Sequence, residues 1–321
     1  MLDLTFEQFF NAEFRLYGGN PVVRRFGLST VVADPSVLTP DVSPDGLWHM
    51  FAHTLFGVYE FLSDDGIRFG RGRRILSRAM RPDIKCVDGL YYLFYERVQP
   101  LPVKALAASG RGWRSEIYVA VSRDLKKYSA PKKVLGYDMP YERAVGGKGH
   151  SLSNPFLLET DNGFSLYYSA GLTYLKDCGF SEPTYIFRAA GSRPDGAFVK
   201  SYEPIIVPDA KSELFNLCCG CLKVYRLKDG YIGLQNGIFK ENGASKSAIQ
   251  LLRSENGKDF EFVRTLLAPS EECGGWMKQY VYSSCLTSYG GVLRLYFNAR
   301  DKSNPISGRE NIGFAEASIP T

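Results

Sequence analysis

Carboxylate, guanidinium, imidazole and amide side chains recur along this sequence beside runs of apolar and aromatic residues. Side chains of these types, where they converge, form a polar cleft that can orient a ligand and exchange protons with it. The candidates for such a cleft are Asp34, His53, Arg81, Asp83, Glu96, Glu116, His150, Asn154, Glu182, Tyr185, Asn236, Tyr282 and Arg300. Whether they converge depends on the elements that carry them.

A second candidate for chemistry is the segment 216–225, NLCCGCLKVY, which holds three of the seven cysteines. Zinc sites use separated pairs of cysteines, commonly Cys-x2-4-Cys, with a second pair elsewhere. Cys218 and Cys219 are adjacent, so on a strand they point to opposite faces, and the sequence has no second pair. The segment is therefore predicted to be an inner strand whose small residues allow close packing, with neither a metal nor a redox role.

Five segments of the chain share one pattern, and they begin near residues 32, 81, 152, 217 and 281. Each has a short apolar strand, a tight turn, an apolar-aromatic strand, a loop and a third strand, and in four of them a short fourth strand follows. The tight turns contain dipeptides that tolerate positive φ, as a hairpin requires: Asp45-Gly46, Asp88-Gly89, Asn162-Gly163, Asp229-Gly230 and Gly290-Gly291.

Four antiparallel strands repeated five times predict an all-β fold, a five-bladed β-propeller. We expect residues 1–321 to form a single domain, because each blade needs its neighbours to bury its faces. The fifth repeat ends without a fourth strand, and residues 18–25, GGNPVVRR, are predicted to complete it and close the ring. A short helix is expected within residues 4–14, with Thr5 as a possible cap.

In a propeller the first strand of every blade lines the central channel. Because successive strands alternate in direction, the start of the first strand, the end of the second and the start of the third meet on one face. This rule selects the thirteen candidates above, and in the fifth repeat it also selects Arg309 and Asn311 at the start of the third strand. The candidates are therefore expected to surround one axial pocket.

The segments ADPSVL, RPDIKCVDGLYYLFYE and SNPFLLETDNGFSLYYSAG resemble the blade starts of the five-bladed glycosidases. These enzymes are glycoside hydrolase family 43 and its relatives in families 32, 62, 68 and 130, and the resemblance covers nearly the whole chain as a blade pattern. It implies an inverting glycoside hydrolase, in which an Asp activates water and a Glu acts as general acid. Asp34 matches the general-base position, and Asp83 matches an acidic position of the second blade.

The usual acid of these families is absent. Asn154 stands where family 43 has an Asp, and Cys219-Gly220-Cys221 stands where its Glu-Gly-Pro-like motif would be. The Glu-Cys-Pro motif of family 32 corresponds here to Ser153-Asn154-Pro155. Two other carboxyl groups are available as the acid, Glu182 and Glu96, and Glu182 is preferred.

Two alternatives to hydrolysis remain open. A phosphorylase similar to family 130 would use an Asp as acid and hold inorganic phosphate with basic side chains, and Arg81, Lys148 and His150 could fill that role. The missing acid also favours a propeller that binds glycans without catalysis. No metal ligand or cofactor is assigned. Calcium occurs in the channel of relatives, but its ligands in this chain cannot be named from the sequence. His49 and His53 cannot share an ion, because they are four residues apart on one strand, a distance of about 13 Å.

The composition of the chain limits the classes of partner that we expect. The net charge is +5, but the Lys and Arg residues are scattered rather than grouped into a stripe, which argues against nucleic acid. The first residues do not follow the pattern of a signal peptide, and no apolar run approaches the roughly 20 residues of a membrane span. We expect a cytoplasmic protein whose partner is a carbohydrate, and the oligomeric state is not predicted.

Overall fold

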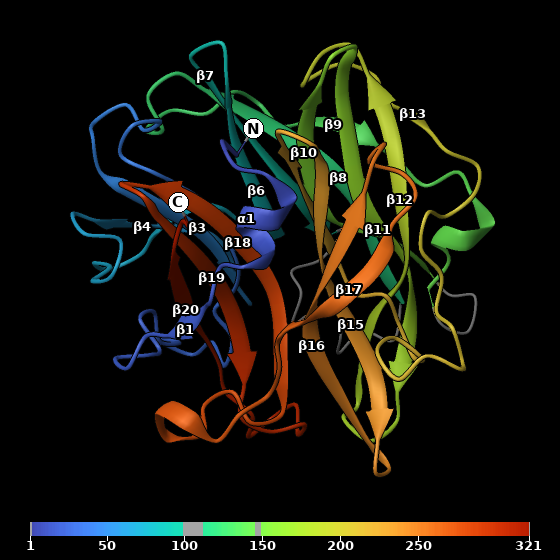
Figure 1. The fold of residues 1–321 in the computed structure, drawn as a ribbon. Helices are drawn as coiled ribbons and strands as arrows, with labels where there is room; N and C mark the ends of the chain where they lie inside the picture. The colour runs from blue at the N-terminus through green and yellow to red at the C-terminus, as the bar shows by residue number, and fades with distance from the viewer. Residues whose placement is uncertain (1, 99–111, 145–148, 321) are drawn as a thin grey trace.

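The computed structural model describes residues 2–98, 112–144 and 149–320, and its regular structure is almost entirely β-strand (Figure 1). Helices among these residues are short: α1 (Phe6–Phe10), η1 (Pro140–Glu142) and η3 (Glu272–Gly274). The all-β prediction is confirmed. None of the described helices is long and apolar enough to cross a membrane.

The strands pair in sequence order, so that each group of consecutive strands is antiparallel. The first sheet has four strands: β2 (Ala33–Leu38), β3 (Trp48–Thr54), β4 (Gly57–Ser63) and β5 (Arg73–Leu76). The second has eight: β6 (Ala79–Val87), β7 (Leu90–Val98), β8 (Trp113–Ser122), β9 (Lys132–Leu135), β10 (Gly149–Thr160), β11 (Gly163–Leu175), β12 (Phe180–Gly191) and β13 (Val199–Lys200).

The third sheet also has eight strands and includes both ends of the chain. Its members are β14 (Leu222–Leu227), β15 (Gly230–Glu241), β16 (Ala244–Ser254), β17 (Glu261–Leu267), β18 (Tyr280–Tyr289), β19 (Val292–Arg300), β20 (Glu310–Ser318) and β1 (Arg15–Leu16). Each eight-stranded sheet is two antiparallel groups of four joined by one short parallel pairing, β8 with β10 and β16 with β18.

The N-terminal segment adds a strand to β20, but not with the residues expected. The ladder pairs Arg15 with Glu316, whereas within the predicted segment 18–25 only Val23 forms a bridge, to Ile312. Pro21 has no N–H to donate to a ladder. The side chain of Asn20 instead exchanges hydrogen bonds of 2.8 and 3.0 Å with the backbone of Phe314.

The predicted helix within 4–14 is present and shorter, at Phe6–Phe10. Thr5 caps it: its hydroxyl accepts a hydrogen bond from the backbone of Gln8 at 3.3 Å, and the Gln8 side chain accepts one from the Thr5 N–H at 3.0 Å. This reciprocal arrangement is a capping box. The helix ends at Phe10, and Asn11 is its C-cap.

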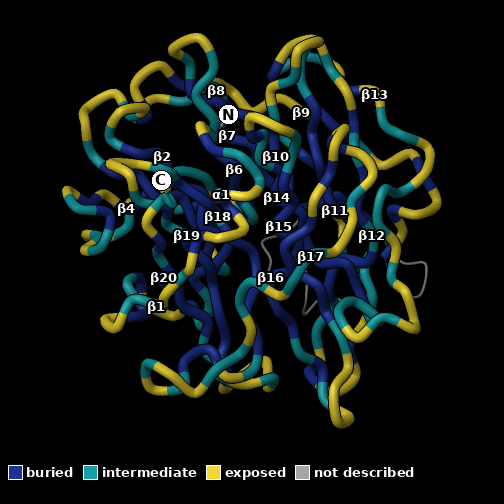
Figure 2. Tube along the Cα trace, viewed as in Figure 1, coloured by how far each residue is buried: buried dark blue, intermediate teal, exposed yellow. Residues whose placement is uncertain are grey.

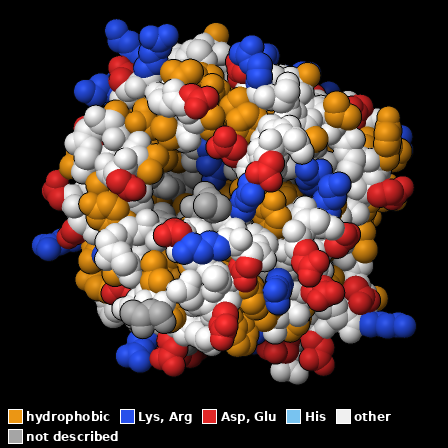
Figure 3. Space-filling view, turned by 45° about the horizontal axis from the view of Figure 1, so that its top comes forward, with side chains coloured by type: hydrophobic (Ala, Val, Ile, Leu, Met, Phe, Trp, Pro, Cys, Tyr) orange, Lys and Arg blue, Asp and Glu red, His pale blue; other side chains and the backbone are white. Residues whose placement is uncertain are grey.

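Buried residues lie along the strands, and exposed residues lie mainly in the turns (Figure 2). Tyrosines link neighbouring groups of strands. Tyr296 on β19 donates a 2.7 Å hydrogen bond to the carbonyl of Gly66, and Tyr167 on β11 donates one of 2.7 Å to the carbonyl of Gly257. On the face shown in Figure 3, Lys and Arg side chains are interspersed with Asp and Glu.

The first strands of four groups begin with the same backbone distortion. A register shift interrupts the pairing of β2, β6 and β10 with the strand that follows each. Within each interruption lies a residue with positive φ: Asp34 (53°), Arg81 (51°) and Asn154 (48°). Gly220 (63°) has a similar φ ahead of β14. Bulges redirect side chains, and left-handed backbone at residues other than glycine is concentrated at functional sites.

Candidate active site

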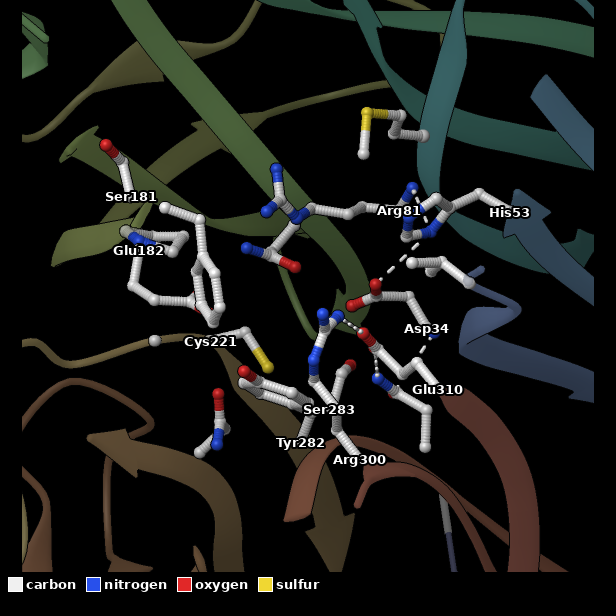
Figure 4. A pocket seen from close by; sticks show the side chains of 18 of the residues that line it. Asp34, His53, Arg81, Ser181, Glu182, Cys221, Tyr282, Ser283, Arg300 and Glu310 are labelled. Atoms are coloured by element: carbon white, nitrogen blue, oxygen red, sulfur yellow. Dashed lines mark hydrogen bonds and ion pairs between the residues drawn. The ribbon is translucent and has the colours of Figure 1, made fainter. Parts of the chain in front are cut away.

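A cavity of about 430 Å³ lies where the starts of these strands meet the ends of the second strands and the starts of the third. Its volume is within the range of small-molecule sites. Eight of the predicted residues line it: Asp34, His53, Arg81, Asn154, Glu182, Asn236, Tyr282 and Arg300. The alternation of strand direction, which placed these residues together in the sequence analysis, therefore accounts for eight of the 24 lining residues (Figure 4).

Asp34 is buried and held in place from two sides. Its backbone N–H donates a 3.1 Å hydrogen bond to Oδ1 of Asn298, and its Oδ2 lies 3.2 Å from Nδ1 of His53 at the end of β3. Burial raises the pKa of Asp34, but the hydrogen bond from His53 and the positive charges of His53, Arg81 and Lys223 outweigh burial and leave that pKa below its ordinary value. Asp34 is thus a carboxylate at neutral pH and can accept a proton.

The pKa of Glu182 is shifted in the opposite direction to that of Asp34. Glu182 is 9% exposed near the start of β12, on the far side of the cavity from Asp34 in Figure 4. Burial raises its pKa to about 7; repulsion from Glu310 and Asp34 adds to this, while Arg81 and the hydroxyl of Tyr282 act against it. Glu182 therefore keeps its proton up to about neutral pH. Two carboxyl groups whose pKa values are pushed apart are the usual mark of an acid and a base in one site.

Arg81 is positioned by Glu96, which lies behind the cavity wall and is itself held by Trp113. Its Nη1 lies 2.5 Å from Oε2 of Glu96, which is fully buried, and the indole of Trp113 donates a 3.0 Å hydrogen bond to the other oxygen of Glu96. Burial lowers the pKa of Arg81, but the charges of Glu96, Asp34 and Glu182 more than offset it, so the guanidinium stays charged. Glu96 does not line the cavity, so of the two candidate acids only Glu182 does.

The third carboxylate of the cavity, Glu310, was missed by the sequence analysis, which selected Arg309 and Asn311 on either side of it. Side chains alternate along a strand, so an error of one residue reverses the face. Glu310 accepts hydrogen bonds from the amide of Asn298 and, at 3.4 Å, from Nη1 of Arg300. Counting back in steps of two from the buried Ile312 would have identified it.

Asp83 does not line the cavity. Its Oδ2 accepts a 2.9 Å hydrogen bond from the backbone of Leu157, and its Oδ1 lies 3.4 Å from the hydroxyl of Ser36 and 3.3 Å from Nζ of Lys85. These contacts tie β6 to β2 and β10. The structural equivalent of Asp34 in the second group is instead Arg81, because these two share the left-handed backbone within the bulge.

The other three predicted residues lie outside this cavity. Glu116 pairs with Lys133 at 3.3 Å. His150 stacks on Tyr137 with 4.7 Å between ring centroids, and burial, with nearby basic side chains, lowers its pKa. Tyr185 lines a separate, neighbouring hollow.

The cysteine segment reaches the cavity at one point. Cys221 lines it, whereas Cys218 and Cys219 are buried in apolar clusters, and burial raises the pKa of all three thiols. All seven cysteines are free. A Cβ on Gly220 would lie 2.0 Å from the carbonyl oxygen of Asn236, so this position has no room for an acidic side chain. No group of three or more His, Cys, Asp or Glu among the described residues is arranged to hold a metal ion.

Comparison with solved structures identifies the architecture. A glycoside hydrolase superposes with a TM-score of 0.71 at 12% identity, over 99% of this chain and 97% of that chain. A thermostable family-43 glycoside hydrolase gives 0.65 at 13% identity, over 93% and 92%. This chain shares the fold of these two glycoside hydrolases.

A third solved structure, the Listeria innocua β-1,2-mannobiose phosphorylase with β-1,2-mannobiose, gives a TM-score of 0.62 at 10% identity, over 96% of this chain and 97% of that chain. No protein-family model and no curated protein matches the sequence. Because all three structural matches are distant in sequence, they establish the fold alone, and the chemistry has to be argued from the cavity.

Proposed function

We propose that this protein is an inverting glycoside hydrolase in which Asp34 is the general base and Glu182 the general acid. One observation carries the proposal: the two carboxyl groups line the same cavity, and their surroundings lower the pKa of Asp34 and raise that of Glu182 to about 7. A base that is ionised and an acid that is protonated at the same pH are what cleavage of a glycosidic bond requires. The implied partner is a carbohydrate.

The proposed reaction moves two protons. Glu182 donates its proton to the glycosidic oxygen as the bond from that oxygen to the anomeric carbon breaks. Water attacks the opposite face of the anomeric carbon and gives its proton to Asp34, whose orientation is set by His53 and Asn298. Exchange with solvent then returns a proton to Glu182 and removes one from Asp34. The sugar leaves with inverted configuration.

We also infer that the strands form five blades of four around this cavity. The proposed blades are β2–β5, β6–β9, β10–β13, β14–β17, and β18–β20 completed by β1. The antiparallel order within each group and the recurrent bulges at the starts of β2, β6, β10 and β18 support this arrangement. The single domain and the cytoplasmic location stay predictions.

Phosphorolysis has less support from the arrangement of basic groups. Of the residues considered for phosphate, Arg81 lines the cavity and is paired with Glu96. His150 lies outside it, against Tyr137, and Lys148 lies outside the described residues. Hydrolysis needs no anion site, and the two carboxyl groups are in place for it.

The decisive experiment is a screen of 4-nitrophenyl glycosides of arabinofuranose, xylose, mannose and galactose, with and without phosphate, followed by two variants. Asp34→Asn is expected to lose at least about 10³-fold in kcat. Glu182→Gln is expected to lose about 10²- to 10⁴-fold on substrates with poor leaving groups and far less on 2,4-dinitrophenyl glycosides, which leave without a proton. Proton NMR of the first product should show the inverted anomer.

Three results would reject the proposal. Unchanged turnover by Asp34→Asn would remove the base, and a requirement for phosphate would make the enzyme a phosphorylase. Binding of glycans by the wild-type protein without any cleavage would leave the non-catalytic alternative.

A further inference from the structure

A second hollow, of about 320 Å³, adjoins the cavity across the β11–β12 hairpin. Leu172 on β11 lines both the hollow and the cavity. The other side chains that matter in the hollow are Tyr141, Arg143, Thr173, Thr184 and Tyr185. Nothing in the proposed hydrolytic step uses this space.

The hollow lies next to the part of the cavity that contains Glu182, the proposed general acid. Glu182 and Pro183 line the cavity, and the next two residues of β12, Thr184 and Tyr185, line the hollow. Thr173 is directly opposite Glu182 in the ladder. A general acid contacts the oxygen of the departing group, so a leaving group bound beside Glu182 extends toward its neighbours on the hairpin.

The chemistry of the hollow suits a sugar ring. Tyr141 is 38% exposed and packs edge-on against Tyr185, with 5.3 Å between ring centroids, so an aromatic surface stays available for the C–H face of a pyranose or furanose. The hydroxyls of Thr173 and Thr184 are 2.9 Å apart and offer donors and acceptors for sugar hydroxyls. Arg143 also lines the hollow, and its Nε donates a 3.3 Å hydrogen bond to the hydroxyl of Tyr137.

The hollow is also preformed. Gly171 has a φ of 69°, and a Cβ added there would lie 2.6 Å from the carbonyl oxygen of Tyr141. The glycine therefore lets the segment that carries Tyr141 approach β11 closely. The ring of Tyr141 also packs against the ring of Phe187, with 5.7 Å between ring centroids. A rigid, preformed surface binds with a smaller loss of conformational freedom.

We propose that this hollow binds the sugar unit on the leaving-group side of the scissile bond, so that the substrate class is an oligosaccharide rather than a monosaccharide with a small aglycone. The inference rests on the proposed function, because it takes Glu182 as the acid.

The test compares two substrates of each sugar. A glycosyl fluoride has a leaving group of one atom, which cannot reach the hollow, whereas a trisaccharide places sugar units beyond Glu182. Wild type is screened on fluorides and trisaccharides of arabinofuranose, xylose, mannose and galactose. For Tyr141→Ala, the ratio of kcat/KM for the trisaccharide to kcat/KM for the fluoride is expected to fall about tenfold.

Three further variants sharpen the comparison. Tyr141→Phe keeps the ring and is expected to change the ratio less than about twofold. Tyr174→Ala removes a tyrosine that is 49% exposed on the same hairpin and lines neither hollow nor cavity, and it should also leave the ratio unchanged. Thr184→Val removes one hydroxyl with little change in shape, so it serves if Tyr141→Ala does not fold, and its expected fall is about threefold.

Each result supports or overturns the inference. An unchanged ratio in both Tyr141→Ala and Thr184→Val, an equal fall in Tyr174→Ala, or wild-type cleavage of fluorides without cleavage of any trisaccharide would overturn it. Failure of the proposed function looks different: wild type then cleaves neither substrate, or Asp34→Asn leaves both rates unchanged.

Discussion

At the scale of single residues, Asp34 and Glu182 show how neighbours can separate two equally buried carboxyl groups. Burial raises the pKa of both. Asp34 has a hydrogen-bonded imidazole and several nearby positive charges, whereas Glu182 is opposed by two other carboxylates and has Arg81 as its principal positive neighbour. The partners, rather than the depth of burial, therefore decide which carboxyl group has the lower pKa and which the higher.

The first prediction is the pH dependence of kcat/KM. Activity is expected to decline above about pH 7, as Glu182 loses the proton it must donate, and to persist down to acidic pH because the pKa of Asp34 is lowered. On a substrate with a poor leaving group, which needs the proton, the residual activity of Glu182→Gln should retain the acidic limb and lose the alkaline one. An alkaline limb that is identical in wild type and Glu182→Gln would contradict the assignment.

The second prediction concerns stability. The pKa of Glu182 is about 7 in the folded protein and 4.5 ordinarily, so the folded state binds more protons between these values. The stability that protonated Glu182 contributes is full below about pH 4.5 and is lost as pH rises through 7. Relative to wild type, Glu182→Gln should gain on the order of 3 kcal/mol in unfolding free energy between pH 4.5 and pH 8.

Urea denaturation at several pH values measures this difference. Asp34→Asn is the control, because its stability should depend on pH in the opposite direction. The pKa of Asp34 is lowered on folding, so the stability that ionised Asp34 contributes is present above about pH 3.8 and is lost as the pH falls further. A constant difference between wild type and Glu182→Gln across the range would show that Glu182 is not protonated in the folded state.

At the scale of elements, the bulges at the strand starts explain both the success and the errors of the sequence analysis. Apolar-aromatic runs and turn dipeptides are local signals, so the hairpins and their ends could be predicted. A bulge is a local change of the backbone that no particular sequence motif indicates. It adds one residue to a strand, so the residues after it are displaced by one position relative to the neighbouring strand. For this reason Asp83 was expected in the cavity, where Arg81 lies. Glu310 was missed for a different reason, because an error of one residue along the unbroken ladder of β20 selects the opposite face.

The third prediction tests the left-handed position of the fourth group. Gly220→Ala is expected to destabilise the protein by more than about 3 kcal/mol, because the added Cβ would lie 2.0 Å from a backbone oxygen and the φ of 63° is unfavourable. Gly89→Ala is the matched control: its φ is 72°, but nothing lies within 4 Å of the Cβ, so about 1 kcal/mol is expected. Equal losses in chemical denaturation would show that backbone strain alone matters.

At the scale of the whole molecule, the chain ends meet at β1 and β20, almost 300 residues apart in sequence. The five-fold repeat indicates that such a closure is needed, because the last repeat lacks a strand. It does not indicate which residues supply the strand, since pairing between distant segments depends on packing that no local pattern records. Residues 18–25 had suitable composition, but the ladder formed at Arg15–Leu16 and α1 was placed in the adjacent core.

The fourth prediction follows from that packing. Phe9 of α1 is fully buried in a cluster with side chains of β15, β16, β18 and β19, while Phe10 is 41% exposed. Phe9→Ala should therefore lower the unfolding free energy by about 3–5 kcal/mol, and Phe10→Ala by about 1 kcal/mol or less. Thermal and urea denaturation of the two variants measure the difference. Equal, small losses of unfolding free energy would mean that the N-terminal segment only covers a core that is already complete. The larger loss expected for Phe9→Ala would mean that this segment fills a gap between the fourth and fifth groups of strands and holds the two ends of the chain together.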